Sequence, residues 1–215
     1  MGSTTAQAGA ADLAMRLRDG TRELHRAAER SAFMRRLLAG EVDLAGYVRL
    51  LRNLHALYER LEAALARHAA VGPLRLVHEP ALWRAAALEA DLAVLHGGAW
   101  RQSIPLTAAA AAYVGRLDGL DASDPALLLA HSYVRYLGDL SGGQVLLGVV
   151  ADAYGLRDGA GTRFYAFGPP GAGVLAARYR QGLAAMRLDD DLAARVLEEA
   201  RDAFRRHGAL FAQLG

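Results

Sequence analysis

The chain has 215 residues, 53% of them hydrophobic, and its net charge of +2 is spread without a basic tract, which predicts no nucleic-acid partner. It contains no cysteine, which excludes disulfides, thiolate metal ligands and iron–sulfur clusters and suits the cytoplasm. No apolar run is long and uncharged enough for a membrane segment. Residues 1–10 are small and polar, unlike a signal peptide, and we expect them to be disordered before a single domain over residues 11–215.

The apolar spacing predicts helices along the whole chain and no strand. Ser31 and Asp43 are expected to cap helices, and proline opens three others. The predicted helices cover residues 11–30, 32–38, 43–68, 79–96, 105–117, 125–154, 173–186 and 189–211. Only Gly155 to Gly173, rich in glycine and proline, forms a long loop. The fold class is therefore all-α, a single-domain bundle of about eight packed helices.

The most unusual of these helices contains three glycines, Gly138, Gly142 and Gly143. Each glycine in a helix interior costs about 1 kcal/mol relative to alanine, so some function must compensate. Gly138 and Gly142 are four residues apart and share a face that exposes bare backbone, against which a flat group could lie and where the helix could kink. Close packing of another helix is the structural alternative.

The segment Leu140–Gln144 also matches the signature of ABC-transporter ATPases. Those proteins need a phosphate-binding loop with a lysine that reaches the nucleotide. This chain has no lysine, so we reject that interpretation.

The longer segment Tyr136–Gln144, with the sequence YLGDLSGGQ, resembles the distal-helix signature of heme oxygenases, and Thr21–Met34 is similar to their proximal segment. The resemblance extends from about Leu13 to Leu214. It implies a soluble, bacterial-type heme oxygenase that converts heme and O2 to biliverdin, carbon monoxide and ferrous iron. Heme b would be both cofactor and substrate, sandwiched between a proximal helix and a kinked distal helix.

His25 lies within the proximal segment, and a lone helical histidine is usually an ordinary surface or core residue. Two neighbours favour a metal-ligating role: Glu29, four residues later, can accept the second ring N–H, and Arg18 lies two turns earlier, about 10 Å along the axis. By resemblance, His25 is the axial ligand of the heme iron and Arg18 a propionate partner. The resemblance adds further heme-binding residues: Met34, Tyr133, Arg180 and Phe211.

On the distal side, Gly138, Gly142 and Gly143 would cover the iron with backbone and no acid. Asp139 is expected to anchor waters near the oxygen and, beside Arg135, to be ionised at neutral pH. A simple surface ion pair is the alternative for Arg135 and Asp139. By resemblance Tyr58 joins this network, and His207 stands where relatives carry an asparagine. His131 remains only a weak candidate for a sixth iron ligand.

Electrons must come from a partner reductase or ferredoxin, because no G-x-G-x-x-G segment follows any strand. Two rival interpretations remain at this point. One is a non-catalytic heme carrier or sensor on the same fold. The other is an all-helical protein without heme, in which the glycines serve only packing.

Overall fold

The computed structural model describes residues 12–70 and 72–215, so the predicted disorder of residues 1–10 lies outside the described part of the chain. Within this part the chain is all-α and forms no strand, as predicted. The α-helices are α1 (Asp12–Glu29), α2 (Ala32–Leu38), α3 (Leu44–Arg67), α4 (Ala85–His96), α5 (Trp100–Ser103), α6 (Ala108–Ser123), α7 (Leu128–Ala153), α8 (Ala172–Ala185) and α9 (Asp190–Ala212). Short 3-10 helices cover Gly72–Leu76, Pro80–Leu82 and Pro125–Leu127.

Helix starts that depend on a local cap agree with the prediction. The side chains of Ser31, Asp43 and Asp189 each accept a hydrogen bond from the backbone N–H three residues later, at 3.3, 2.7 and 2.7 Å. Helix α2 ends before Gly40, whose φ of +70° lies in the left-handed region that favours glycine.

Two predicted helices differ from the structure, and contacts between distant segments explain both. The chain is not helical at Trp83 and Arg84, so the predicted 79–96 helix divides, because Glu62 accepts the Arg84 N–H at 2.5 Å. The helix predicted from Pro105 begins at Ala108, because Asn53 Oδ1 accepts both the N–H and the hydroxyl of Thr107. Helix α5 was not predicted.

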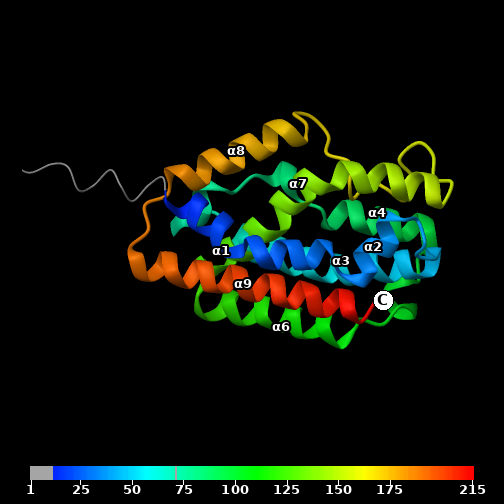
Figure 1. Ribbon diagram of the computed structural model, residues 1–215, viewed down its shortest axis with the longest axis horizontal. Coiled ribbons are helices and arrows are strands. Elements are labelled where there is room, and N and C mark those ends of the chain that lie inside the picture. Colours follow the sequence, from blue (N-terminus) through cyan, green and yellow to red (C-terminus); the bar gives the residue numbers. More distant parts are fainter. Residues whose placement is uncertain (1–11, 71) are drawn as a thin grey trace, which may run out of the picture.

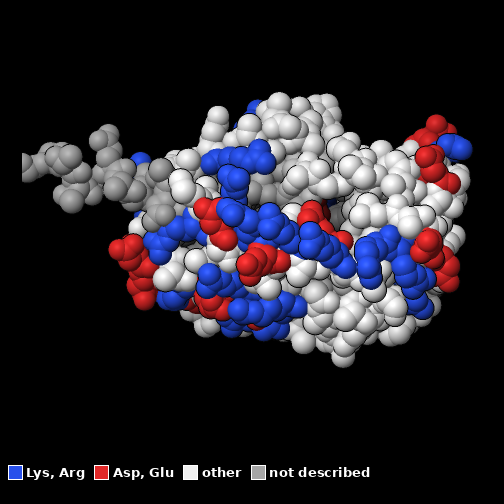
Figure 2. All heavy atoms as spheres, in the orientation of Figure 1, with Lys and Arg blue, Asp and Glu red and all other residues white. Residues whose placement is uncertain are grey.

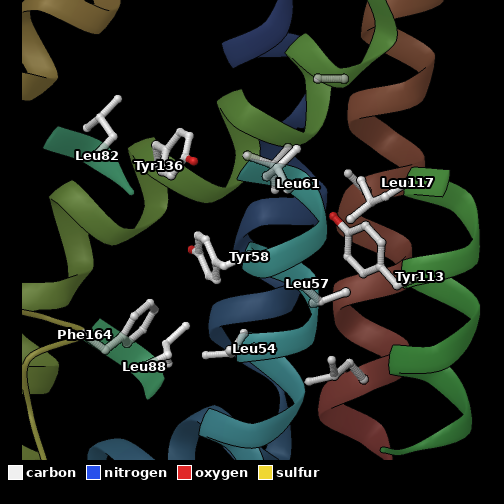
Figure 3. Close-up of a cluster of buried hydrophobic side chains, with 14 of the residues drawn as sticks. Leu54, Leu57, Tyr58, Leu61, Leu82, Leu88, Tyr113, Leu117, Tyr136 and Phe164 are labelled. Carbon is white, nitrogen blue, oxygen red and sulfur yellow. The ribbon is translucent and has the colours of Figure 1, made fainter. Parts of the chain in front are cut away.

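Helix α8 packs against both α1 and α7 (Figure 1). Helix α1 lies along α9, α3 contacts α4 and α6, and α7 contacts α3, α8 and α9. Helix α7 is helical through all its glycines, and Figure 1 shows it changing direction along its length. Leucine, tyrosine and phenylalanine side chains fill the space between α3, α6 and α7 (Figure 3). Among the described residues, no helix has the length and apolar character needed to cross a membrane.

Candidate functional site

The middle of α7 presents an open surface of bare backbone. Gly138 and Gly142 are exposed, and a Cβ atom added at either position would meet nothing within 4 Å. Gly143 is instead buried, and its Cβ would lie 3.7 Å from the Tyr165 ring. The open face therefore consists of Gly138 and Gly142. Gly143 lies on the buried side of the helix and faces Tyr165.

Helix α1 carries a histidine, His25, whose Nε2 has no hydrogen-bond partner in the described part of the chain. His25 Nδ1 lies 3.5 Å from Glu29 Oε2, and half of the His25 side chain is exposed. The Phe204 ring meets the imidazole edge-on, with 5.9 Å between ring centroids. Glu29 can thus hold the Nδ1–H while Nε2 stays available, as the four-residue spacing predicted. Phe204 was not among the predicted site residues, because only the packing of α9 on α1 reveals it.

The two predicted propionate partners lie near the same tyrosine. Burial raises the pKa of Tyr133, and a hydrogen bond with Thr21 and the positive charges of Arg18 and Arg180 oppose the rise. Arg18 is on α1 and Arg180 on α8, both exposed, and neither forms an ion pair within the described residues. Arg178, the alternative on α8, is already paired with Glu79 at 3.3 Å.

The other two predicted heme contacts, Met34 and Phe211, differ from each other in burial. Met34 is half-buried on α2. Phe211 is buried, stacks on Phe33 at 5.6 Å and meets the His207 ring edge-on at 4.3 Å. The structure thus shows Phe211 supporting the polar network that contains His207.

Three acceptors surround the buried guanidinium of Arg135. Its Nε donates to the Tyr58 hydroxyl, its Nη2 to Asp139 Oδ1 and its Nη1 to His207 Nε2, each at 3.0 Å. The Tyr58 hydroxyl donates to the other oxygen of Asp139. The structure confirms the predicted Arg135–Asp139 pair and shows that Tyr58 and His207 bind to it. We call these four residues the distal network.

Burial dominates the electrostatics of this network. It raises the pKa of Asp139, although Arg135 and the Tyr58 hydrogen bond oppose the rise. Arg135 therefore lowers the pKa of Asp139 as expected, but burial has the larger effect on that pKa. Burial and the charge of Arg135 both lower the pKa of His207 well below its ordinary value, so the ring is neutral and can accept. The site thus holds an acid beside a bare, open helix face.

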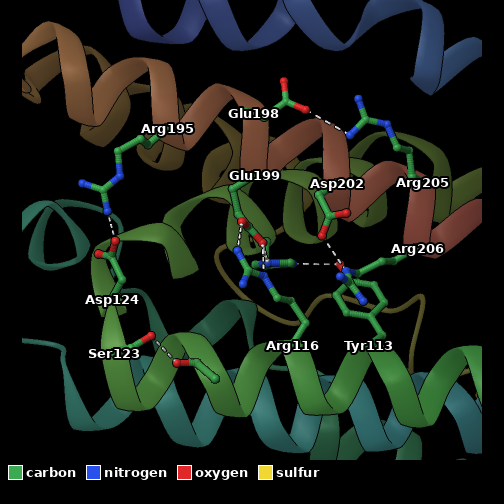
Figure 4. A network of polar contacts seen from close by, with 12 residues as sticks. Tyr113, Arg116, Ser123, Asp124, Arg195, Glu198, Glu199, Asp202, Arg205 and Arg206 are labelled. Carbon is green, nitrogen blue, oxygen red and sulfur yellow. Dashed lines mark hydrogen bonds and ion pairs between the residues drawn. The ribbon is translucent and has the colours of Figure 1, made fainter.

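The structure removes His131 as a candidate iron ligand. Its side chain is fully buried, with Nδ1 at 3.0 Å from the Tyr113 hydroxyl and Nε2 at 2.9 Å from Glu199. Arg116 binds the same glutamate from the surface, as Figure 4 shows. Both ring nitrogens are therefore occupied.

Comparison with known proteins agrees with this geometry. Residues 11–213 match the family model described as "Heme oxygenase". Heme oxygenase 1 of Nostoc sp. is 37% identical over 94% of this chain and 86% of its own length. The crystal structure of heme oxygenase-1 from the cyanobacterium Synechocystis sp. in complex with heme has a TM-score of 0.90 at 39% identity, covering 94% of this chain and 92% of that one. A heme oxygenase structure from Leptospira interrogans gives a TM-score of 0.87 at 36% identity, over 94% and 99% of the two chains.

Proposed function

The chain belongs to the heme oxygenase family, and from this premise we propose that it binds heme and oxidises it to biliverdin, carbon monoxide and ferrous iron. One observation carries the proposal at the level of residues. Helix α1 carries an exposed histidine with a carboxylate near its Nδ1, and helix α7 carries two bare glycines and a buried acid. Its relatives of known structure include one in complex with heme.

The residues fit heme on the proximal side. His25 would ligate the iron through Nε2, with Glu29 fixing the ring orientation. Arg18 and Arg180 would bind the propionate carboxylates, because their guanidinium groups lie near one point, Tyr133, and lack ion-pair partners among the described residues. The Phe204 ring packs edge-on against the His25 imidazole and would help to hold it in place.

On the distal side, Gly138 and Gly142 allow a flat ring to lie directly against backbone. Bound heme supplies the iron that activates oxygen and the carbon that is oxidised. Asp139, held by Arg135 and Tyr58, would order water beside the oxygen and deliver protons through it. Because Gly138 and Gly142 carry no acidic group, protons would reach the oxygen only through the water that Asp139 holds.

The reaction needs electrons, and an arginine row on α1 suggests where a donor binds. Arg18, Arg22 and Arg26 on the helix that carries His25, and Arg30 directly after that helix, are exposed at four-residue spacing. Figure 2 shows basic side chains forming a band across this face. A reductase or ferredoxin with an acidic surface fits this row by charge. The lack of cysteine accords with the reducing cytoplasm, which we propose as the compartment.

The test is a titration of ferric heme into the purified chain, followed by ascorbate in air and identification of the products. We expect a one-to-one complex that yields biliverdin and carbon monoxide. His25→Ala should lose this turnover, and added imidazole should restore part of it. A complex that keeps its heme under these conditions would instead indicate a carrier or sensor.

A further inference from the structure

A second acid–tyrosine pair lies beside the distal network. Helix α3 contributes Tyr58 and, one turn later, Glu62, while the facing helix α7 contributes Tyr136 and, nearly one turn later, Asp139. The Tyr58 and Tyr136 rings are 6.1 Å apart between centroids, and Figure 3 shows the two side chains on neighbouring helices. Tyr58 already binds Asp139, which leaves Glu62 and Tyr136 as the remaining acid and hydroxyl.

Glu62 is a buried carboxylate that forms no ion pair with any residue that the structure describes. It is 6% exposed and accepts hydrogen bonds from the backbone N–H groups of Arg84, at 2.5 Å, and Ala85, at 3.2 Å. The Arg84 guanidinium does not neutralise it, because it donates to the carbonyl groups of Leu82 and Ala166 and to that of Ala81. A buried carboxyl group held only by two amides is well placed to carry a proton.

Tyr136 supplies an unsatisfied hydroxyl at the same place. Its hydroxyl group is buried and has no hydrogen-bond partner within the described residues. After burial, the negative charge of Glu62 is the largest influence that raises the pKa of Tyr136. Buried hydroxyl groups almost always have a partner, so the unpaired hydroxyl of Tyr136, which feels the charge of Glu62, requires an explanation.

We propose that Glu62 and Tyr136 store and relay a proton for Asp139 during turnover. Glu62 gives its proton through one water to the Tyr136 oxygen, as the Tyr136 hydroxyl proton passes through a second water to the Asp139 carboxylate. Glu62 becomes charged, Asp139 becomes neutral and Tyr136 is unchanged, so the pair of acids keeps one negative charge. This role rests on the proposed function, because heme oxidation is what consumes the proton.

The charges around Glu62 agree with such a store. The pKa of Glu62 is raised to about 7, with burial as the largest cause; the charge of Asp139 adds to the rise, and the amide hydrogen bonds and the charge of Arg84 oppose it. Arg84 faces it from the segment before α4, Tyr136 and Asp139 from α7, and Tyr58 from its own helix. Protonating Asp139 removes a neighbouring negative charge and so favours release of the Glu62 proton.

The decisive test uses the heme-free protein, where infrared spectroscopy follows the carbonyl band of protonated carboxyl groups as pH changes. We expect a band that titrates near pH 7, that disappears in Glu62→Gln and that titrates at lower pH in Asp139→Asn. Glu199→Gln is the matched control, because Glu199 is also buried but its pKa is lowered to about 2. A band that survives Glu62→Gln, or that Asp139→Asn leaves in place, overturns the proposal.

The heme-loaded enzyme then tests the relay. Glu62→Gln and Tyr136→Phe should each lower kcat about tenfold with KM unchanged, and should abolish the dependence of kcat on pH near neutrality. Wild-type kcat profiles in both variants would contradict the relay while leaving biliverdin formation intact. Failure of the wild type itself to form biliverdin would instead refute the proposed function.

Discussion

Two buried polar networks share helix α7, and both combine an arginine, a carboxylate, a tyrosine and a histidine. The distal network contains Arg135, Asp139, Tyr58 and His207. The second, which we call the brace, contains Arg116, Glu199, Tyr113 and His131. Although their chemical composition is nearly the same, their carboxylates behave in opposite ways.

In the brace, burial raises the pKa of Glu199, but hydrogen bonds from His131 and Arg116 outweigh burial and bring it down to about 2. In the distal network burial prevails, and the pKa of Asp139 is raised. The arginines explain the difference. Arg116 directs two nitrogens at one carboxylate from a partly exposed position, whereas the fully buried Arg135 divides its donors among three acceptors.

The consequence is a division of roles on one helix. The brace joins α6, α7 and α9 with a fully charged pair. The distal network keeps an acid able to take up a proton, beside the bare face of Gly138 and Gly142. A salt bridge alone therefore does not decide whether a buried acid is structural or functional.

The largest expected effect is the loss of stability on removing the arginine of the distal network, compared with removing the arginine of the brace. Arg135→Leu should destabilise the heme-free protein by about 3–5 kcal/mol, because it leaves a buried acid unpaired. Arg116→Leu, at a side chain that is 38% exposed, should cost about 1 kcal/mol. Urea unfolding of both variants measures the difference. Equal losses would show that the two networks do not differ in this way.

Filling the open face should affect only the distal side. Gly142→Leu places a branched side chain where we propose that heme and oxygen lie, and should lower turnover about a hundredfold, equivalent to about 2.7 kcal/mol, with little change in melting temperature. Gly148→Leu on the same helix, where a Cβ also meets nothing within 4 Å, is the matched control. If the two variants retain the same turnover, Gly142 does not face the heme.

The two acids should give opposite pH dependences of stability. The pKa of Glu199, about 2, lies below the ordinary value of 4.5, so its stabilisation is present above pH 4.5 and is lost as pH falls toward 2. Glu199→Gln should remove up to about 3 kcal/mol of that acid-sensitive stability. Asp139 has a raised pKa, so its contribution instead declines as pH rises, and Asp139→Asn should lose less stability at alkaline than at acid pH. Melting temperatures measured across pH test both predictions. The same direction of pH dependence in the two variants would contradict them.

Surface arginines should show the smallest effect. Arg180→Ala should weaken heme binding by a few-fold to about tenfold and alter the ratio of biliverdin isomers, because it removes the charge-assisted bond that we propose to a propionate. Arg195→Ala near the brace removes an arginine that is paired with Asp124 and should leave both quantities unchanged. Heme titration with chromatography of the products distinguishes them, and identical isomer ratios would remove Arg180 from the site.

Features determined within one helix could be predicted from the sequence. The caps at Ser31 and Asp43 and the Arg135–Asp139 pair depend on spacings of three or four residues. The break at Arg84 depends on Glu62, a contact between segments far apart in the chain. Phe204 and Tyr136 could not be assigned for the same reason, since their roles depend on which helices face each other.

The central claim is that Asp139 directs oxidation to the heme ring while Glu199 only braces the fold. The direct test compares Asp139→Asn and Glu199→Gln, each loaded with ferric heme and treated with hydrogen peroxide in a stopped-flow spectrometer. Both variants should bind heme. Asp139→Asn should oxidise the ring about a hundredfold more slowly and instead consume peroxide on an added phenol, whereas Glu199→Gln should match the wild type. Wild-type ring oxidation in Asp139→Asn, without phenol oxidation, would contradict the account.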